Sequence, residues 1–238
     1  SIYPRPSEQE LNSFYEAYYD DGKFIFRDEK HSNLGWLRKI RNKFTGDVDP
    51  RDFIHPNRTA KILDYGCGGA SYIQYFHNKG YEISGADVSL EVVEQSRQNG
   101  LNVEKVNDFN EIPFPSDHFD IVYLMQVFEH LRDPNTFLKE LNRVLADRGH
   151  LYISIPNADS VWRKIFKKNW VSGYFAPFHL AHYNEKTLTV LAEKYGFKVE
   201  KTFYRTPESW FRLNFKALWH PEINDLDFYS SWIDSKLA

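Results

Sequence analysis

Side chains able to bind a ligand or move a proton recur along this chain of 238 residues. Carboxylates close two short apolar runs, at Asp64 and Asp87, and glycines follow the first of them. Histidines stand further along, at His130, His179 and His182. Paired carboxylates suit a sugar diol, glycines let a ligand approach the backbone, and imidazoles accept protons near neutral pH. These residue types indicate a polar ligand site with a proton acceptor beside it.

The first carboxylate belongs to a segment that reads as a buried strand turning sharply into a helix. The strand begins near Lys61, and the glycines at Gly66 and Gly68 allow a bend that side chains would block. A helix is expected from about Ala70 to Lys79. Its free N-terminal amides would point at whatever ligand the turn receives.

A second strand, Gly80–Asp87, ends about 20 residues later, the separation at which doubly wound α/β folds place an acid that binds ribose. Parallel strands present their carboxyl ends at one edge of the sheet, so Asp64 and Asp87 are expected in a shared crevice. A dinucleotide site would have a further glycine where this chain has Ser71, which disfavours NAD and FAD.

The segment Asp64–Ala70 resembles the first motif of class I S-adenosylmethionine-dependent methyltransferases, acidic-x-Gly-x-Gly-x-Gly, with Ala70 at the third glycine. Later segments, among them Ile112–Asp120, match the same superfamily in order over about residues 60–200. The resemblance implies a Rossmann-like α/β fold, a doubly wound, mostly parallel sheet of seven strands with helices on both faces. It also implies S-adenosylmethionine as the cofactor.

Roles for individual residues follow from this resemblance. Asp64 would hold the ammonium of the methionine part, Asp87 the ribose hydroxyls, and Asp108 the adenine amine. An aspartate at a strand end is also common turn chemistry, which is the alternative for Asp108. The full set of cofactor-binding residues implied is Asp64, Gly66, Cys67, Gly68, Asp87, Val88, Asp108, Phe109 and Gln126.

Glu129 and His130 follow the fourth expected strand, in a segment similar to the Glu-His-Leu-x-Asp-Pro element of many small-molecule methyltransferases. A carboxylate beside an imidazole can transfer protons or hold a divalent ion. Ubiquinone-type O-methyltransferases are similar here and use an acid-x-x-acid-His cluster for metal, but this chain has Gln126 at the first acidic position. We therefore expect no metal. Bracing of the loop by hydrogen bonds is the alternative role for both residues.

Residues 158–183 interrupt the alternation of strands and helices after the fifth strand, and we expect them to form a cap over the cofactor's methyl group. The cap combines a basic, aromatic run, Val161–Trp170, with His179 and His182. It is similar to a segment of a bacterial methyltransferase subgroup linked to surface-polysaccharide and secondary-metabolite genes, with Phe178 where that subgroup has arginine. Peripheral contact of the basic run with an anionic lipid surface is an alternative use.

The predicted function is O-methylation of a small-molecule or sugar hydroxyl. Such a hydroxyl must lose its proton, and we expect His179 to accept it, with His182 and His130 as second choices. The alternatives are an N- or C-methyltransferase of the same fold, and a catalytically silent module that holds a partner with the cap. The sequence contains no Asn-Pro-Pro-Tyr element, which disfavours methylation of nucleic-acid bases.

Helix-capping residues indicate where the remaining helices begin, and short apolar runs indicate the remaining strands. The expected helices are 90–98 after Ser89, 134–145 after Asp133 and 185–195 after Asn184. The expected further strands are 103–106, 121–125, 150–155 and 196–204, with the last strand in the tail 205–238.

Domain organisation, partners and cellular location are predicted from the length, charge and composition of the chain. Residues 1–59 are predicted to form a helical extension or lid that opens with a capping box at Ser7–Glu10, and residues 60–238 the binding domain. The 30 basic and 33 acidic residues indicate no nucleic-acid partner, and no apolar run approaches the ~20 residues of a membrane span. A single cysteine, Cys67, fits a reducing compartment, so we expect a cytoplasmic monomer or homodimer.

Overall fold

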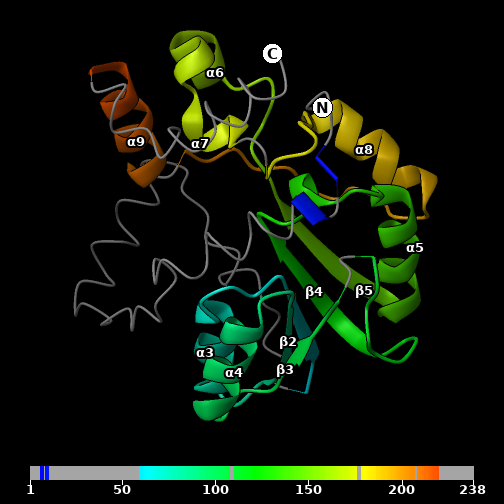
Figure 1. Ribbon diagram of the computed structural model, residues 1–238. Helices are drawn as coiled ribbons and strands as arrows, with labels where there is room; N and C mark the ends of the chain where they lie inside the picture. The colour runs from blue at the N-terminus through cyan, green and yellow to red at the C-terminus, as the bar shows by residue number, and fades with distance from the viewer. Residues whose placement is uncertain are drawn as a thin grey trace.

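A parallel sheet of five strands forms the centre of the protein (Figure 1), in the order β3-β2-β1-β4-β5. The structure is a computed structural model, and it describes residues 6–7, 9–10, 59–107, 110–175, 178–206 and 208–219. The strands are β1 (Lys61–Tyr65), β2 (Glu82–Asp87), β3 (Val103–Lys105), β4 (Phe119–Met125) and β5 (Leu145–Ser154). The chain runs outward from β1 to β3 and then returns to β4. Ligands bind at such a switch point, beyond the carboxyl ends of the strands.

The side chains of β4 show how the sheet divides the core. Ile121 and Tyr123 belong to the apolar cluster on one face, whereas Val122 and Leu124 belong to the cluster on the other. All four are buried, as expected for a parallel strand with both faces covered.

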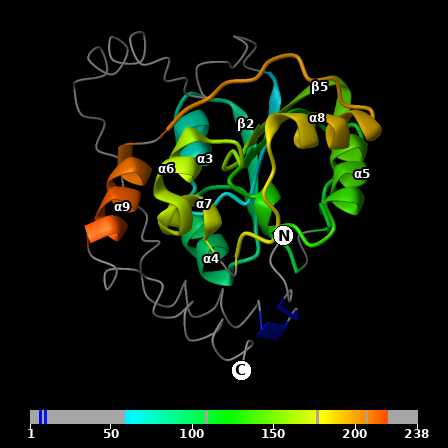
Figure 2. The same ribbon diagram turned by 90° about the horizontal axis from the view of Figure 1, so that it is seen from above.

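Helices cover both faces of the sheet, as Figures 1 and 2 show. The helices on one face are α3 (Ser71–His77) and α4 (Leu90–Gln98), which bury Ile73, Phe76 and Val93. The helices on the other face are α5 (Pro134–Val144) and α8 (Glu185–Lys194), and Phe137 and Leu141 of α5 are fully buried there. The doubly wound α/β prediction is confirmed for these elements.

The predicted helix caps are confirmed. Ser89, Asp133 and Asn184 each accept backbone N–H bonds from the first turn of the helix they precede, at 2.8 to 3.3 Å. The capping box near the N-terminus is also present, since Glu10 N–H donates to Ser7 Oγ at 3.2 Å and Ser7 N–H to Glu10 Oε2 at 2.7 Å.

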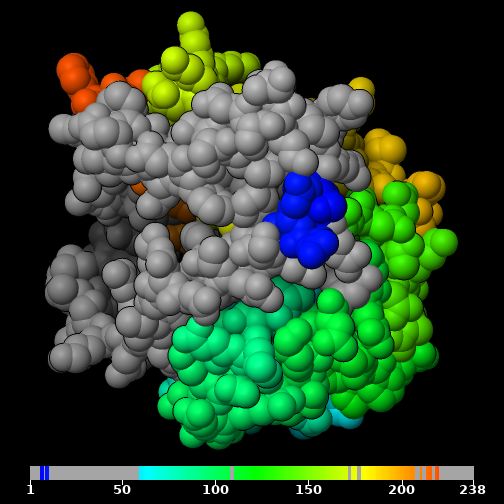
Figure 3. All heavy atoms as spheres, in the orientation of Figure 1, coloured from blue at the N-terminus to red at the C-terminus, as the bar shows by residue number. Residues whose placement is uncertain are grey.

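The segment that carries this capping box lies against the loop after β4, because Arg132 Nη2 donates to the carbonyl of Pro6. In Figure 3 the blue atoms of this segment border the green surface. Most of residues 1–59 lies outside the described residues, so the helical lid remains a prediction.

Residues 158–183 leave the sheet and return to it, as predicted for an insertion. Asn157 and Tyr183 form a parallel bridge at its base, and Ala158 N–H donates to Tyr183 O at 2.8 Å. The insertion contains α6 (Val161–Phe166), the 3-10 turn η3 (Lys167–Asn169) and α7 (Val171–Tyr174). These pack against α9 (Glu208–Trp219), and Figures 1 and 2 show α6, α7 and α9 grouped together, apart from α5 and α8.

The sixth strand differs from the prediction, and the seventh, expected in the tail 205–238, is not found among the tail residues that the structure describes. Residues 197–206 run without a strand beside β5, where Glu200 Oε2 lies 3.9 Å from His150 Nδ1. The segment is almost wholly exposed, so it lacks the buried face that fixes the register of a strand. Within the tail, residues 208–219 form α9, and 220–238 lie outside the described residues. The prediction of a strand over 196–204 is therefore wrong.

None of the helices in the described ranges is both long and apolar enough to cross a membrane.

Candidate cofactor crevice and acceptor cap

The glycine turn after β1 is held against the end of β2 by backbone hydrogen bonds. Gly66 N–H and Cys67 N–H both donate to Ala86 O, at 2.8 and 3.2 Å. Gly66 has φ 74°, and a Cβ there would overlap Cγ2 of Val127 in the loop after β4. A Cβ on Gly68 would meet nothing within 4 Å. The glycine at 66 is therefore required by Val127, while the space beside Gly68 is open to a ligand.

Asp87 ties this turn to the helix that follows β2. Its Oδ2 accepts Gly68 N–H at 2.8 Å and its Oδ1 accepts Ser89 N–H at 2.9 Å. Burial raises the pKa of Asp87, although these backbone donors act to lower it. A carboxylate oxygen has two lone-pair sites, so Asp87 can still accept hydroxyl groups from a ligand.

Asp64 is a buried carboxylate without a hydrogen-bond partner among the described residues. It is 2% exposed, and no described donor or cation is near enough to hold its charge. Burial, and then the neighbouring charge of Asp87, raise the pKa of Asp64 to about 7. The two carboxylates lie close enough for their charges to interact, and a cationic ligand would offset the repulsion between them. That they line one ligand-binding crevice stays a prediction.

Gln126 stands at the end of the neighbouring strand in a conformation that is uncommon outside glycine, with φ 61°. Its N–H donates to Ser154 O at 2.8 Å and its Nε2 to Ser154 Oγ at 2.9 Å. The remaining oxygen, Oε1, is buried and has no partner in the described part of the chain. Such left-handed residues cluster at functional sites, because the surroundings must hold them there.

The cap is docked on the loop after β4 by its backbone. Leu180 N–H and Ala181 N–H both donate to the carbonyl of Glu129, at 2.9 and 3.2 Å. Glu129 and His130 lie in a single 3-10 turn, η2 (Phe128–His130). This contact brings His179 of the cap beside Glu129 and His130, residues far apart in the sequence.

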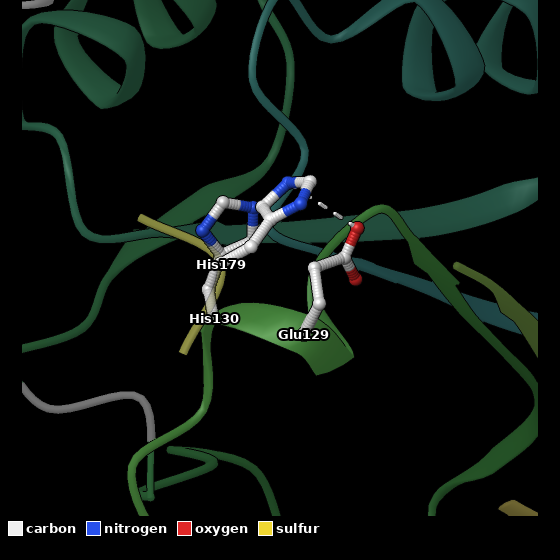
Figure 4. Close-up of side chains that lie close together, drawn as sticks. All are labelled: Glu129, His130 and His179. Atoms are coloured by element: carbon white, nitrogen blue, oxygen red, sulfur yellow. Dashed lines mark ion pairs between the residues drawn. The ribbon is translucent and has the colours of Figure 1, made fainter. Parts of the chain in front are cut away.

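Three titratable side chains meet at this junction, as Figure 4 shows for Glu129, His130 and His179. One ligand atom from each lies within 4.8 Å of the other two, and His179 Nε2 is 3.8 Å from Glu129 Oε1. Burial raises the pKa of Glu129 to about 8. Burial also lowers the pKa of His179 to about 4 and that of His130 well below its usual range. Near pH 7 both imidazoles are neutral.

The three candidate bases differ in how their ring nitrogens are engaged. His179 Nδ1 lies 2.9 Å from Gly173 O, and its Nε2 faces Glu129. His182 is half-buried, and its Nδ1 has no hydrogen-bond partner in the described ranges. Burial lowers the pKa of His182, so this ring is neutral at pH 7, and its unpaired Nδ1 is itself buried.

Some predicted residues cannot be placed at this site. Asp108 and Phe109 lie outside the described residues. The chain leading to Asp108 does reach the crevice, since Val106 N–H donates to Asp87 O at 3.0 Å. Val88 follows Asp87 directly and is half-buried against the apolar cluster of α5.

The contacts that fix the cap internally were not predicted from the sequence. Gly173 holds His179 by its carbonyl, and a Cβ on Gly173 would overlap the ring of Trp170. The signal available was one glycine in an aromatic segment, three residues after a tryptophan. Val127 was also missed, because its contact with Gly66 joins two loops that are distant in sequence.

Comparison with known proteins gives consistent matches. The family described as "Methyltransferase domain" matches residues 35–202, more than half of the chain. A ubiquinone biosynthesis O-methyltransferase from Pelagibacter ubique is 25% identical over 154 residues, which cover 63% of this chain and 63% of that protein. The chain therefore spans less than two thirds of the length of this curated relative.

Solved structures agree on the fold. A SAM-dependent methyltransferase from Methanosarcina mazei, 22% identical, covers 68% of this chain and 91% of its own, with a TM-score of 0.55. The [4+2]-cyclase SpnF, 17% identical, covers 94% of this chain and 86% of its own, with a TM-score of 0.58. The glycine motif, the sheet order and the family match agree: the chain belongs to the methyltransferase domain family, in the class I group whose cofactor is S-adenosylmethionine.

Proposed function

We propose that this protein transfers a methyl group from S-adenosylmethionine to a hydroxyl of a small-molecule or sugar acceptor bound beneath residues 158–183. The observation that carries this proposal is the docking of the cap on Glu129 at the end of β4, next to the crevice of Asp64 and Asp87. An acceptor beneath the cap would be screened from water, which a displacement at a sulfonium requires.

Two observations support binding of the cofactor in this crevice. Asp64 is buried without a partner among the described residues, which suits a ligand that carries an ammonium and a sulfonium charge. The space beside Gly68 is open, and Asp87 retains acceptor capacity for ribose hydroxyls. When bound, S-adenosylmethionine would supply an electrophilic methyl carbon. The chain's own part is to orient it, and we assign that to Asp64, Asp87 and the backbone at 66–68.

The acceptor hydroxyl must also lose a proton, and the geometry favours His182 as its destination. Among the three candidate histidines, His182 combines partial exposure with an unpaired Nδ1. His179 has Nδ1 occupied by Gly173 O and is only 5% exposed. We therefore assign proton acceptance to the imidazole of His182, and to His179 a role in holding the cap.

The relatives' printed names support oxygen as the acceptor atom, since the Pelagibacter protein is named an O-methyltransferase. Bacterial sugar or secondary-metabolite acceptors remain the favoured class because of the cap segment 170–183. Amine or carbon acceptors would use the same crevice and would differ only beneath the cap.

The test is a transfer assay with methyl-labelled donor and purified protein. Nucleotide sugars, phenols and lipid-linked sugars are offered as acceptors, with amines as a parallel set. Label on a hydroxyl oxygen is the expected result. Label only on amines would select N-methylation instead. Tight binding of S-adenosylhomocysteine with no transfer to any acceptor would favour a silent binding module, or a different reaction on this fold as in the cyclase neighbour.

A further inference from the structure

At the junction between the cap and the sheet, the carboxyl group of Glu129 is buried without hydrogen-bond partners among the described residues, which costs folding free energy. The residue is 1% exposed, and neither Oε1 nor Oε2 has a hydrogen-bond partner within the described residues. His179 Nε2 stands 3.8 Å from Oε1, which is too long for a hydrogen bond. A buried carboxyl group with both oxygens unsatisfied destabilises a fold unless something else occupies the space in front of it.

Two imidazoles lie beside this carboxyl group, and both are hydrogen-bonded to the backbone. His179 Nδ1 bonds to Gly173 O at 2.9 Å, which leaves the lone pair of Nε2 directed at Glu129. His130 is hydrogen-bonded to the backbone of Phe178, and its ring packs edge-on against His179 with centroids 4.8 Å apart. A histidine whose second ring nitrogen donates to a carbonyl has the tautomer and orientation of a metal ligand.

We propose that Glu129, His130 and His179 together bind a divalent transition-metal ion of the zinc type. One ligand atom from each of the three lies within 4.8 Å of the others. Bonds of roughly 2.0 to 2.2 Å in tetrahedral geometry place ligand atoms about 3.4 Å apart. The pair at 3.8 Å is already close to that separation, and the widest pair closes by rotation of side chains. The ion would then occupy the space in front of the two unpaired oxygens of Glu129.

His179, the third ligand, distinguishes this site from a metal site formed by the loop after β4 alone. Position 126 is a glutamine whose Nε2 is engaged by Ser154, so the carboxylate and imidazole nearest to each other in this loop are those of Glu129 and His130. His179 comes from the cap, and the ion would thus join the cap to the sheet. Two imidazoles and one carboxylate suit zinc and its neighbours, whereas Mg²⁺ and Ca²⁺ prefer all-oxygen sites.

The site revises the expectation that the chain holds no metal. One consequence of this site rests on the proposed function: an ion that fixes the cap would hold it in place over a bound acceptor. Binding of the ion itself depends on neither donor nor acceptor.

The experiment uses the full chain, stripped with a chelator and titrated with Zn²⁺ by calorimetry in the absence of donor and acceptor. One saturable equivalent, with a rise in Tm, is expected, and Mg²⁺ should produce neither. Titration with Co²⁺ should give the intense visible bands of a tetrahedral site. Absence of a stoichiometric site, or Co²⁺ bands of an octahedral, solvent-bound ion only, would overturn the proposal.

Two variants test the ligands separately. Glu129→Gln preserves the shape of the side chain but removes the charged ligand, and His179→Ala removes the cap's contribution. Each should weaken Zn²⁺ binding by more than the roughly 10- to 100-fold that loss of an outer-shell partner causes. His77→Ala, at an exposed histidine on α3, is the matched control and should bind as the wild type does.

Equal affinity in Glu129→Gln and wild type would mean that Glu129 and His179 form a metal-free contact, and the proposal would fail. If either variant does not fold, the Co²⁺ spectrum of the wild-type chain still decides. Because no methyl transfer is measured, failure here leaves the proposed transferase activity untouched.

Discussion

The contacts that hold the cofactor crevice join residues close together in the sequence, whereas those that hold the cap join residues far apart in it. In the crevice, Asp87 binds the amides of Gly68 and Ser89, and all of these lie in two consecutive strand-to-helix turns. At the cap, Glu129 is met by residues from the distant segment 179–181, two of them through backbone amides. The crevice is thus built from local backbone geometry, whereas the cap side exists only once the insertion has docked. A change on one side should leave the other intact.

The largest expected effect separates turnover from cofactor binding. In His182→Ala the acceptor's proton loses its destination, and kcat should fall by roughly 10² to 10⁴, the usual contribution of a general base. Affinity for S-adenosylhomocysteine should stay as in the wild type, because His182 belongs to the cap. Steady-state kinetics and calorimetry measure the two quantities, with His77→Ala as the surface control. Unchanged kcat with the true acceptor would remove His182 from the mechanism.

The second prediction concerns a substitution in the crevice, which should weaken cofactor binding. Asp87→Ala removes the acceptor of two backbone amides and the proposed partner of the ribose, and hydrogen bonds to a charged group contribute about 1.5 to 3 kcal/mol each. Affinity for S-adenosylhomocysteine should fall about 100-fold or more. Glu82→Ala, at the exposed start of the same strand, is the control, because its ion pair with Lys61 is long and solvated.

Calorimetry with both variants decides the outcome. Affinity of Asp87→Ala equal to that of the wild type would contradict the assignment of the crevice to the adenosyl group. If the turn itself unfolds, thermal unfolding will show a lower Tm for Asp87→Ala but not for Glu82→Ala.

A smaller effect is expected from pH, again on the crevice alone. The pKa of Asp64 is raised to about 7, so below this pH the unliganded protein carries a proton there. The ammonium group of S-adenosylhomocysteine favours the ionised carboxylate, so binding below pH 7 must release that proton. Affinity for S-adenosylhomocysteine should therefore rise by up to about tenfold per pH unit between pH 6 and 7 and level off above.

Asp64→Asn, which cannot ionise, is the matched variant for this measurement. It should bind more weakly than the wild type and show no rise in affinity between pH 6 and 7. Because Asp87 lies beside Asp64, the proton released belongs to the pair. A flat wild-type profile would mean that no charge on the ligand meets these carboxylates.

The same difference in range explains what the sequence alone could predict. Helix caps at Ser89, Asp133 and Asn184 depend on the next three residues, and each was predicted correctly. The crevice of Asp64 and Asp87 follows from the rule that parallel strands end at one edge. Nothing local indicates which ring nitrogen of a histidine is engaged, because Gly173 and Glu129 reach His179 through tertiary contacts.

The predicted strand over 196–204 failed for a related reason. Its apolar residues Val199, Phe203 and Tyr204 suit a strand locally, but all three are exposed beside β5. A strand exists only when a neighbour accepts its backbone groups, and this information is not present in a nine-residue pattern.

The smallest predicted effect concerns Ala70, which occupies the third glycine position of the motif. Ala70 is fully buried and has φ 52° and ψ 24°, in the left-handed region. That conformation costs a residue with a Cβ about 1 to 2 kcal/mol, while deletion of a buried methyl group costs about 0.8 kcal/mol. Ala70→Gly should therefore change the free energy of unfolding by less than about 1 kcal/mol, in the stabilising direction, as measured by urea denaturation.

Ala86→Gly deletes the same methyl group from a fully buried alanine in β2, where the backbone is extended and no strain is relieved. It should destabilise the fold by about 1 kcal/mol or more, because glycine also loses more backbone entropy on folding. Opposite signs for the two variants, with affinity for S-adenosylhomocysteine unchanged in Ala70→Gly, would show that local backbone geometry determines the turn. If both variants lose stability equally, the methyl group of Ala70 matters more than its φ, and packing between the turn and the sheet shapes the crevice as well as the cap.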